Sequence, residues 1–432
     1  MIRIVASNIF FRTIAIVSQV LILIITNRLV MAEGRGILAS SITWANTFFT
    51  FFFCSLNIVL FNSINECPAE KDNYQKGVYN ISFLLAVAAV VFSFAVYFLL
   101  PGIFRNIPVP VLFVSFLTVP FILLQNNLWA IFQARHQFNY FNFAIIISPV
   151  VNLLLSILLI LLDRYTVLTG CIATCISWVA GTIYCLIKIG LLLDLRSIKI
   201  FNNKKILSKI LFAHLATIIT FIINRTDILF LNYYTDNRST GFYFMASAMV
   251  GYLLIIPMSI QSILYSKLIG LSEQEEKKMI TTYSRLSFGI MTLSCIFIEL
   301  FADQIIWILG GRSFAVSAYF LRILTPCAII YSVPVIWASL WVAKGYFNKL
   351  TNISFATIVI NLAMNFILVP KYGAKGAAAT FITCCIFIFA LHFLLIRNYY
   401  KGENPFKKLF PQQTDYINIY NKAVDFLKSS RA

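Results

Sequence analysis

The chain has 432 residues, of which 60% are hydrophobic and only 12% are charged. A soluble globular domain of this length does not reach such an apolar fraction, so the composition excludes that class and indicates a polytopic membrane protein. The formal net charge of +18 would suggest nucleic acid in a soluble chain; here the distribution of the charge between loops decides its meaning.

Runs of about twenty apolar residues, separated by polar turns, predict helices that cross the bilayer. These runs lie at 4–28, 36–61, 77–100, 108–132, 140–162, 166–189, 208–233, 239–266, 284–309, 314–343, 350–369 and 373–397. We therefore expect an all-α polytopic membrane protein with twelve transmembrane helices. The first run is too long for a signal-peptide core and no small-residue cleavage site follows it, so we expect no cleavable leader.

The predicted loops differ in charge between the two sides of the membrane. Most Lys and Arg residues fall on the side of the N-terminus, including those of the basic stretch around Lys204, and few fall on the other side, such as Arg28 and Arg105. Because Lys and Arg are enriched in cytoplasmic loops, we expect both termini to be cytoplasmic. The basic excess is then a topology signal and not a nucleic-acid footprint.

The longest basic connection divides the chain into two halves of six helices each. We expect an N-lobe at 1–195, a cytoplasmic basic linker at 196–207, a C-lobe at 208–398 and a cytoplasmic tail at 399–432. An even number of helices per half gives both halves the same orientation, as in parallel repeats.

A weak internal similarity agrees with this division. Arg28 ends the first run before Gly36 opens the second, and Arg225, near the end of the seventh run, precedes Gly241 in the eighth.

The seventh run carries Arg225 and Asp227 within its outer half. A charge at the centre of a helix in the bilayer costs roughly 2.5 to 3.5 kcal/mol on insertion scales, so such a residue is expected to face protein or water and not lipid. Residues two apart on a helix point to different sides, so both need partners elsewhere.

Other charges reach the same depth in the C-lobe. At 1.5 Å per residue, Arg225 and Arg322 lie about 12 Å, and Glu299 about 15 Å, below the outer ends of their helices. Asp303 shares a helix face with Glu299. We predict that Arg225, Asp227, Glu299 and Arg322 form one buried network, which either binds an anionic headgroup or locks an outer gate, or serves only as a structural clamp.

Polar residues form stripes along several runs. In the first run Asn8, Arg12, Gln19 and Thr26 share one helix face. Such a stripe is either the lining of a wet cavity or hydrogen-bonding contact between packed helices, and Arg12 is also close enough to the cytoplasmic end to reach the interface. Aromatic residues, including Trp337 and Trp341 on one face, fit lipid-facing surfaces and interfacial belts.

No arrangement of residues suggests catalysis or a bound cofactor. The nine Cys lie almost entirely in apolar runs without a nearby His at metal-ligand spacing, and the three His are scattered. His214 shares a helix face with Arg225, which leaves proton coupling open; the coupling ion of such a protein would be H⁺ or Na⁺. We expect no enzyme and no metal site.

Four segments resemble one family. NLAMNFILVPKYGAKGAAAT at 361–380 is similar to a signature of polysaccharide flippases, the O-antigen (Wzx-type) translocases of the multidrug/oligosaccharidyl-lipid/polysaccharide exporter superfamily, and weaker similarity covers 27–40, 224–247 and 311–324. The sequence departs from the family at Leu29-Val30, where members usually have Leu-Gly.

The resemblance implies two six-helix lobes around a central cavity and alternating access. The cargo would be a polyprenyl-diphosphate-linked oligosaccharide, an O-antigen or similar repeat unit of lipopolysaccharide, moved from the cytoplasmic to the outer leaflet of the bacterial inner membrane. Membrane lipids and, as further partners, a polysaccharide polymerase and chain-length machinery would surround a monomer that binds no nucleic acid. The candidate substrate or gate residues are Arg12, Gln19, Arg28, Arg225, Asp227, Glu299 and Arg322.

Two other functions compete with this one. A multidrug or ion-coupled antiporter of the same superfamily would usually centre on carboxylates deep in one lobe, whereas the few acids here lie near arginines and favour anionic cargo. A membrane polysaccharide polymerase or acyltransferase would be expected to have a large outer loop or a His/Arg cluster, which the sequence lacks.

Overall fold

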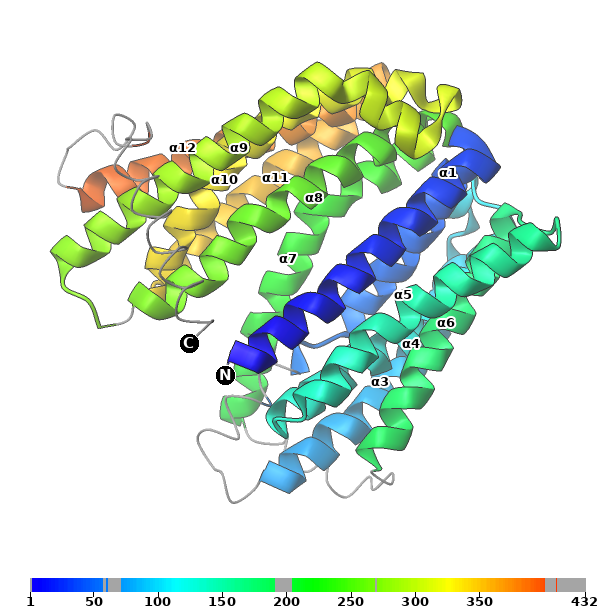
Figure 1. Cartoon of the computed structure of the whole chain (residues 1–432), viewed down its shortest axis with the longest axis horizontal. Coiled ribbons are helices and arrows are strands. Elements are labelled where there is room, and N and C mark those ends of the chain that lie inside the picture. Colours follow the sequence, from blue (N-terminus) through cyan, green and yellow to red (C-terminus); the bar gives the residue numbers. More distant parts are fainter. Residues whose placement is uncertain are drawn as a thin grey trace. The chain divides into compact units, whose positions relative to one another are not determined.

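The computed structural model describes residues 2–56, 60, 71–190, 204–268, 270–400 and 409, and these residues form helices and turns without a strand (Figure 1). Three predicted segments lie partly outside the described residues. These are the linker up to residue 203, the second run after residue 56 except for Leu60, and the tail after residue 400 except for Leu409. The α-helices are α1 (Ile2–Phe52), α3 (Lys71–Leu99), α4 (Val109–Ala134), α5 (Phe138–Leu161), α6 (Val167–Ile189), α7 (Lys204–Tyr234), α8 (Asn237–Leu268), α9 (Glu273–Gly310), α10 (Ala315–Ala343), α11 (Phe347–Tyr372) and α12 (Ala374–Tyr399). Two short 3₁₀ helices are η2 (Pro101–Phe104) and η4 (Arg312–Phe314).

Helix α1 contains the first predicted run and the second as far as Phe52. The 43 residues Phe10–Phe52 would extend about 65 Å as one straight helix, about twice the thickness of the hydrocarbon core. The helix is broken at Met31, whose φ of 57° and ψ of −169° are not helical. The break falls between the two runs, so the chain turns where the sequence predicted a turn.

Ten described helices are long and apolar enough to cross a membrane, with α1 counted once and α7 outside the ten. This confirms the all-α polytopic class. The count of twelve crossings and the cytoplasmic location of the termini stay predictions.

Local sequence explains where several helices begin and end. Thr166 caps α6 through a reciprocal bond with Thr169, and Gly190 ends it at a φ of 64° that favours glycine. Prolines lie inside several of the described helices: Pro120 in α4, Pro149 in α5, Pro257 in α8, Pro326 and Pro334 in α10, and Pro370 in α11.

The chain forms two compact units. The first comprises Met1–Gly241 with Ile308–Ser313. At its centre, α4 packs against α1, α3, α5 and α6, and its side chains at Leu112, Phe116 and Leu123 are fully buried. Helix α7 packs on α1.

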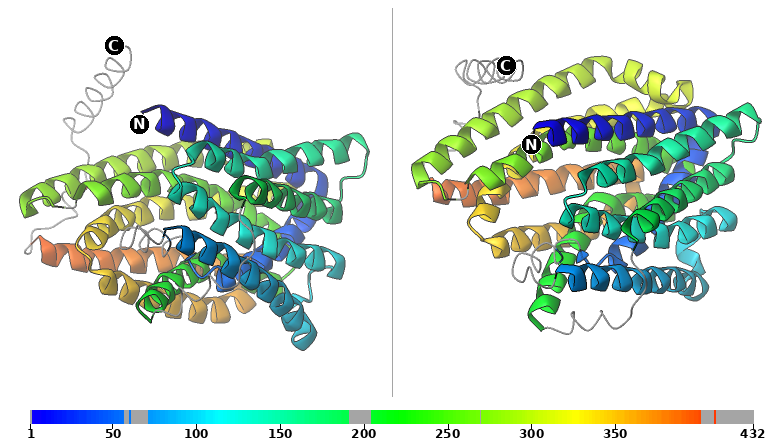
Figure 2. Two further views of the ribbon diagram at one scale, coloured as in Figure 1. Left: turned by 90° about the horizontal axis from the view of Figure 1, so that it is seen from below. Right: turned by 60° about the horizontal axis from the view of Figure 1, so that its bottom comes forward.

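The second unit comprises Phe242–Trp307 with Phe314–Ala432. Its helices α10, α11 and α12 contact one another, and Figure 2 shows them side by side in yellow to orange. Helix α10 is the most buried of the candidate spans. Trp337 and Trp341 are each only 2% exposed, in a core shared with Leu264, Ile280 and Ile396. The expectation that these two tryptophans belong to a lipid-facing or interfacial surface is therefore wrong, because their helix is enclosed by its neighbours.

The boundary of the compact units is not the boundary expected from the sequence. Compactness groups α7 with the first unit, whereas the lobe at 208–398 begins with this helix. The division into lobes that move as bodies stays a prediction.

Candidate functional site

Two candidate residues of the first unit are exposed on α1. The side chains of Arg12 and Gln19 are both exposed, and neither forms a hydrogen bond or ion pair with another described residue. Thr26 of the same stripe is instead buried and bonds the hydroxyl of Tyr165 at 3.0 Å. The stripe is thus divided between an accessible part at Arg12 and Gln19 and a packing contact at Thr26.

Helix α7 separates its two charges. The Arg225 side chain is exposed and has no hydrogen-bond or ion-pair partner among the described residues, whereas Asp227 is only 7% exposed. An Oδ1 oxygen of Asp227 accepts from the backbone N–H of Ile228 at 2.8 Å. The two-residue spacing therefore points the charges to different sides, as expected.

Arg28 lies where α1 approaches the end of α9 that belongs to the same unit. Its guanidinium donates to the carbonyl oxygen of Ile308 at 3.0 Å, and the neighbouring Asn27 amide donates to the carbonyl of Leu309 at 3.2 Å. The last carbonyls of a helix lack partners within that helix. Arg28 and Asn27 therefore cap the end of α9.

Three asparagines, which sequence reasoning did not single out, connect η2 to the turn between α7 and α8. The Asn237 amide donates to the carbonyl of Asn106 at 2.8 Å, and Asn106 donates to the carbonyls of Asn232 and Thr235, the latter at 3.0 Å. Asn232 donates to the side-chain oxygen of Asn237 at 2.9 Å. No signal in the sequence links these residues, because Asn106 follows η2 whereas Asn232 lies in the last turn of α7 and Asn237 begins α8.

Gly36 and Gly241, which the sequence marked only as similar positions, meet in the first unit. The backbone nitrogen of Gly36 lies 3.1 Å from where a Cβ of Gly241 would stand. A Cβ on Gly36 would overlap the carbonyl oxygen of Asn237, and a Cβ on Gly241 that of Ala32. Helix α1 and the first turn of α8 thus touch backbone to backbone, which only glycine allows.

The charges of the second unit pair differently from the prediction. Arg322 forms an ion pair with Asp303, with Nη2 2.6 Å from Oδ2, and the two side chains are 40% and 67% exposed. Glu299 is half-buried and forms no hydrogen bond with a described residue. The predicted burial is wrong for Arg322, whose ion pair with Asp303 is exposed. A network that joins Arg322 and Glu299 to Arg225 and Asp227 stays a prediction.

Two other polar stripes are packing contacts. In the first unit Ser148 donates to the side-chain oxygen of Gln125 at 3.0 Å, and Gln125 donates to the carbonyl of Ala144. In the second unit Asn365 donates to Asn361 at 3.2 Å, and both are buried. The helix-packing interpretation therefore holds for these stripes.

The described residues contain no group of three or more His, Cys, Asp or Glu that could hold a metal ion. The His214 ring of α7 bonds the backbone carbonyl of Phe51 at 2.9 Å. The proposed role of His214 in proton coupling stays a prediction.

No protein-family model matches the chain, and no curated protein sequence matches it. Several solved structures, however, match the chain. The lipid II flippase MurJ, in an inward closed conformation, is 15% identical with a TM-score of 0.73, over 100% of this chain and 98% of that one. An inward-facing multidrug resistance MATE family transporter of the MOP superfamily is 14% identical with a TM-score of 0.71, over 90% and 96%.

A third structure, a MOP superfamily transporter from Pyrococcus furiosus, is 15% identical with a TM-score of 0.60, over 93% of this chain and 95% of that one. At such low identity the similarity establishes the fold alone. The chain therefore shares the fold of these transporter structures, and its membership of the superfamily expected from the sequence stays a prediction.

Proposed function

We propose that this protein is a flippase that moves a polyprenyl-diphosphate-linked oligosaccharide from the cytoplasmic to the outer leaflet by alternating access. The fold is shared with a lipid II flippase and with multidrug transporters. The fold alone does not choose between lipid-linked and other cargo, so the choice rests on the charges.

Arg225 carries the proposal. It is exposed within a helix of 31 residues whose centre is apolar, without a partner among the described residues. An arginine at that depth is too costly to face lipid, so its exposed side chain is best explained by a water-filled cavity. An unpaired guanidinium in such a cavity attracts an anion, and it can bind a phosphate with two parallel hydrogen bonds.

The other exposed candidates of the first unit fit the same cargo. Arg12 provides a second cation that lacks a described partner, and Gln19, two turns further along α1, provides an amide for sugar hydroxyls. An anionic headgroup with hydroxyl groups suits these side chains better than an organic cation does. Arg28 and Asp227 remain candidates for the gate, since Arg28 bonds the end of α9.

Arg225→Gln tests the proposal against Arg164→Gln, a matched change of an exposed arginine in the turn between α5 and α6. In a strain that lacks the chromosomal copy, the amount of lipid-linked oligosaccharide on the cytoplasmic leaflet is measured by leaflet-specific labelling. We expect accumulation without the protein and with Arg225→Gln, and none with Arg164→Gln. No accumulation in the strain without the protein would refute the flippase function.

A multidrug or ion-coupled antiporter is the second candidate, because the similarity to the MATE transporter is nearly as high. An antiporter would export drugs, and this export would depend on Glu299 or Asp227 and on a H⁺ or Na⁺ gradient. Loss of the protein would then leave the amount of lipid-linked oligosaccharide on the cytoplasmic leaflet unchanged. A membrane polymerase or acyltransferase ranks third.

Under the flippase proposal the protein resides in the bacterial inner membrane as a monomer and hands its cargo to a polysaccharide polymerase and chain-length machinery. Coupling to H⁺ or Na⁺ and the O-antigen identity of the cargo belong to the proposal as well.

A further inference from the structure

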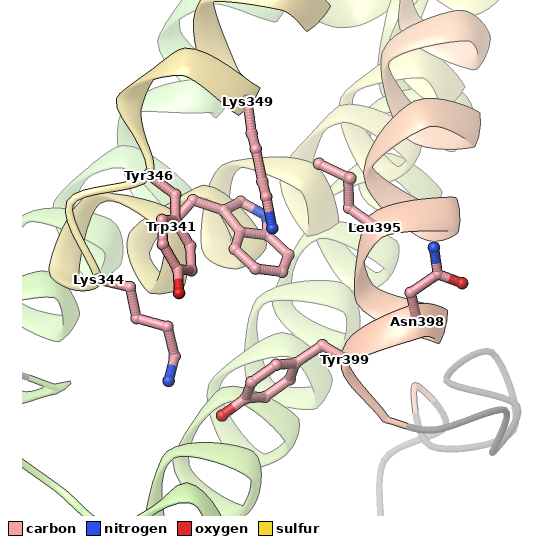
Figure 3. A pocket seen from close by; sticks show the side chains of 7 residues that line it. All are labelled: Trp341, Lys344, Tyr346, Lys349, Leu395, Asn398 and Tyr399. Carbon is pink, nitrogen blue, oxygen red and sulfur yellow. The ribbon is translucent and has the colours of Figure 1, made fainter.

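A pocket lies in the second unit, where α10 ends and α11 begins, beside the end of α12 (Figure 3). Its volume is about 330 Å³. Trp341, Lys344, Tyr346, Lys349, Asn398 and Tyr399 line it. None of these residues belongs to the proposed transport site.

The first lysine of this pocket is neutralised within the unit. The Nζ of Lys344 lies 2.8 Å from a carboxylate oxygen of Glu276, which is only 6% exposed. The same carboxylate accepts a hydrogen bond from the hydroxyl of Tyr399. Lys344 and Glu276 therefore add no net charge to the pocket.

The second lysine is not neutralised. The Nζ of Lys349 lies 4.6 Å from the ring centroid of Trp341 and 4.5 Å from that of Tyr346. Figure 3 shows this side chain beside the Trp341 ring. It forms no ion pair with a carboxylate of the described residues. Aromatic faces hold a cation in place without cancelling its charge. The pocket therefore keeps one fixed positive charge.

The pocket also has more hydrogen-bond donors than acceptors. The indole N–H of Trp341 is buried, in a residue only 2% exposed, and has no hydrogen-bond partner among the described residues. The side chain of Asn398 is exposed at the rim and can donate two bonds. A buried donor without a partner costs free energy, which an oxyanion in the pocket would recover.

The position of the pocket limits the source of that oxyanion. The loop between α10 and α11 is among the basic segments that predict the cytoplasmic side, where lysines near the membrane surface attract anionic lipids. A volume of about 330 Å³ is at the lower end of the range for small-molecule sites and suits a headgroup better than an oligosaccharide.

We propose that this pocket binds the phosphate headgroup of an anionic membrane phospholipid. The Lys349 ammonium and the Trp341 indole N–H contact the phosphate, Asn398 bonds the polar group beyond it, and the acyl chains leave past the partly exposed Leu395. Binding of a phospholipid at this pocket requires that the protein lies in a membrane, and it does not depend on which cargo the protein transports.

The test uses the full chain, purified and freed of lipid, with short-chain phosphatidylglycerol as the probe and native mass spectrometry as the measurement. We expect Lys349→Ala to weaken binding by about 10-fold or more, because it removes a charged hydrogen-bond donor, and Lys349→Arg to retain it. The matched control is Lys375→Ala, which changes a lysine whose Nζ lies 5.8 Å from the Tyr319 ring in the same unit; it should bind as the wild type does.

Asn398→Asp gives a second variant, which changes an exposed side chain and should weaken binding through repulsion even if Lys349→Ala fails to fold. Equal binding of phosphatidylcholine would overturn the proposal, as would wild-type binding by both variants or an equal loss in Lys375→Ala. Displacement of phosphatidylglycerol by inorganic phosphate alone, or by a polyprenyl phosphate at lower concentration, would assign the site to those ligands instead. Transport plays no part in these measurements, so failure of the flippase proposal leaves them unaffected.

Discussion

Replacing Gly36 by alanine tests the closest helix crossing of the first unit. An ideal Cβ on Gly36 would lie 2.6 Å from the carbonyl carbon of Asn237, whereas ordinary contact begins at 3.4 Å. The carbonyl oxygen of Asn237 lies nearer still, so the first turn of α8 must move by more than about 0.8 Å. The obstacle is backbone, so no side-chain rotation can relieve the overlap.

The displacement has an energetic consequence in two parts. Overpacking of this kind costs about 1 to 3 kcal/mol. Movement of Asn237 also strains the hydrogen bonds that its side chain forms with Asn106 and Asn232. We expect Gly36→Ala to lower the free energy of unfolding by about 2 to 3 kcal/mol.

The assay is unfolding of the purified protein by a denaturing detergent, followed by circular dichroism. Gly251→Ala is the control, because it lies in α8 with nothing within 4 Å of the added methyl group, and we expect no loss of stability. Gly241→Ala should match Gly36→Ala, and the double variant should cost less than the sum, because both changes open one contact. A Gly36→Ala protein as stable as the Gly251→Ala protein would refute the close crossing.

Three further changes test the second unit by the same measurement. Arg322→Gln should leave stability nearly unchanged, because its ion pair is exposed; a large loss would show that the pair is enclosed. Glu276→Ala should cost about 1 to 3 kcal/mol, because it removes the partner of Lys344 from a buried position; an unchanged midpoint would contradict the contact. Gly376→Ala should destabilise, because the new Cβ would lie 2.6 Å from the carbonyl carbon of Leu368; stability equal to that of the wild type would rule out this close approach.

The membrane class and the helices could be predicted from the sequence because they depend on local properties. Apolar length alone identifies a segment that crosses a bilayer, and the turn at Met31 falls where a polar stretch interrupts it. The opposite directions of Arg225 and Asp227 also follow from helical geometry alone.

Which residues meet was decided by tertiary structure. Counting residues along each helix predicted that Arg322 and Glu299 lie at the same depth in the membrane. Which side chains bond also depends on the rotation and tilt of the helices, and Arg322 bonds Asp303. The same limit hid the asparagine cluster, in which Asn106 lies more than a hundred residues from Asn232 and Asn237.

The sequence by itself determined that this is a helical membrane protein with charges inside its apolar helices, since the cost of exposing polar backbone to lipid leaves few other structures. Tertiary structure decided that Gly36 and Gly241 touch, that Trp341 is enclosed and that Arg225 is left exposed. The physical reason is that a single helix specifies its own faces, whereas the neighbour that covers a face is specified only by packing between helices.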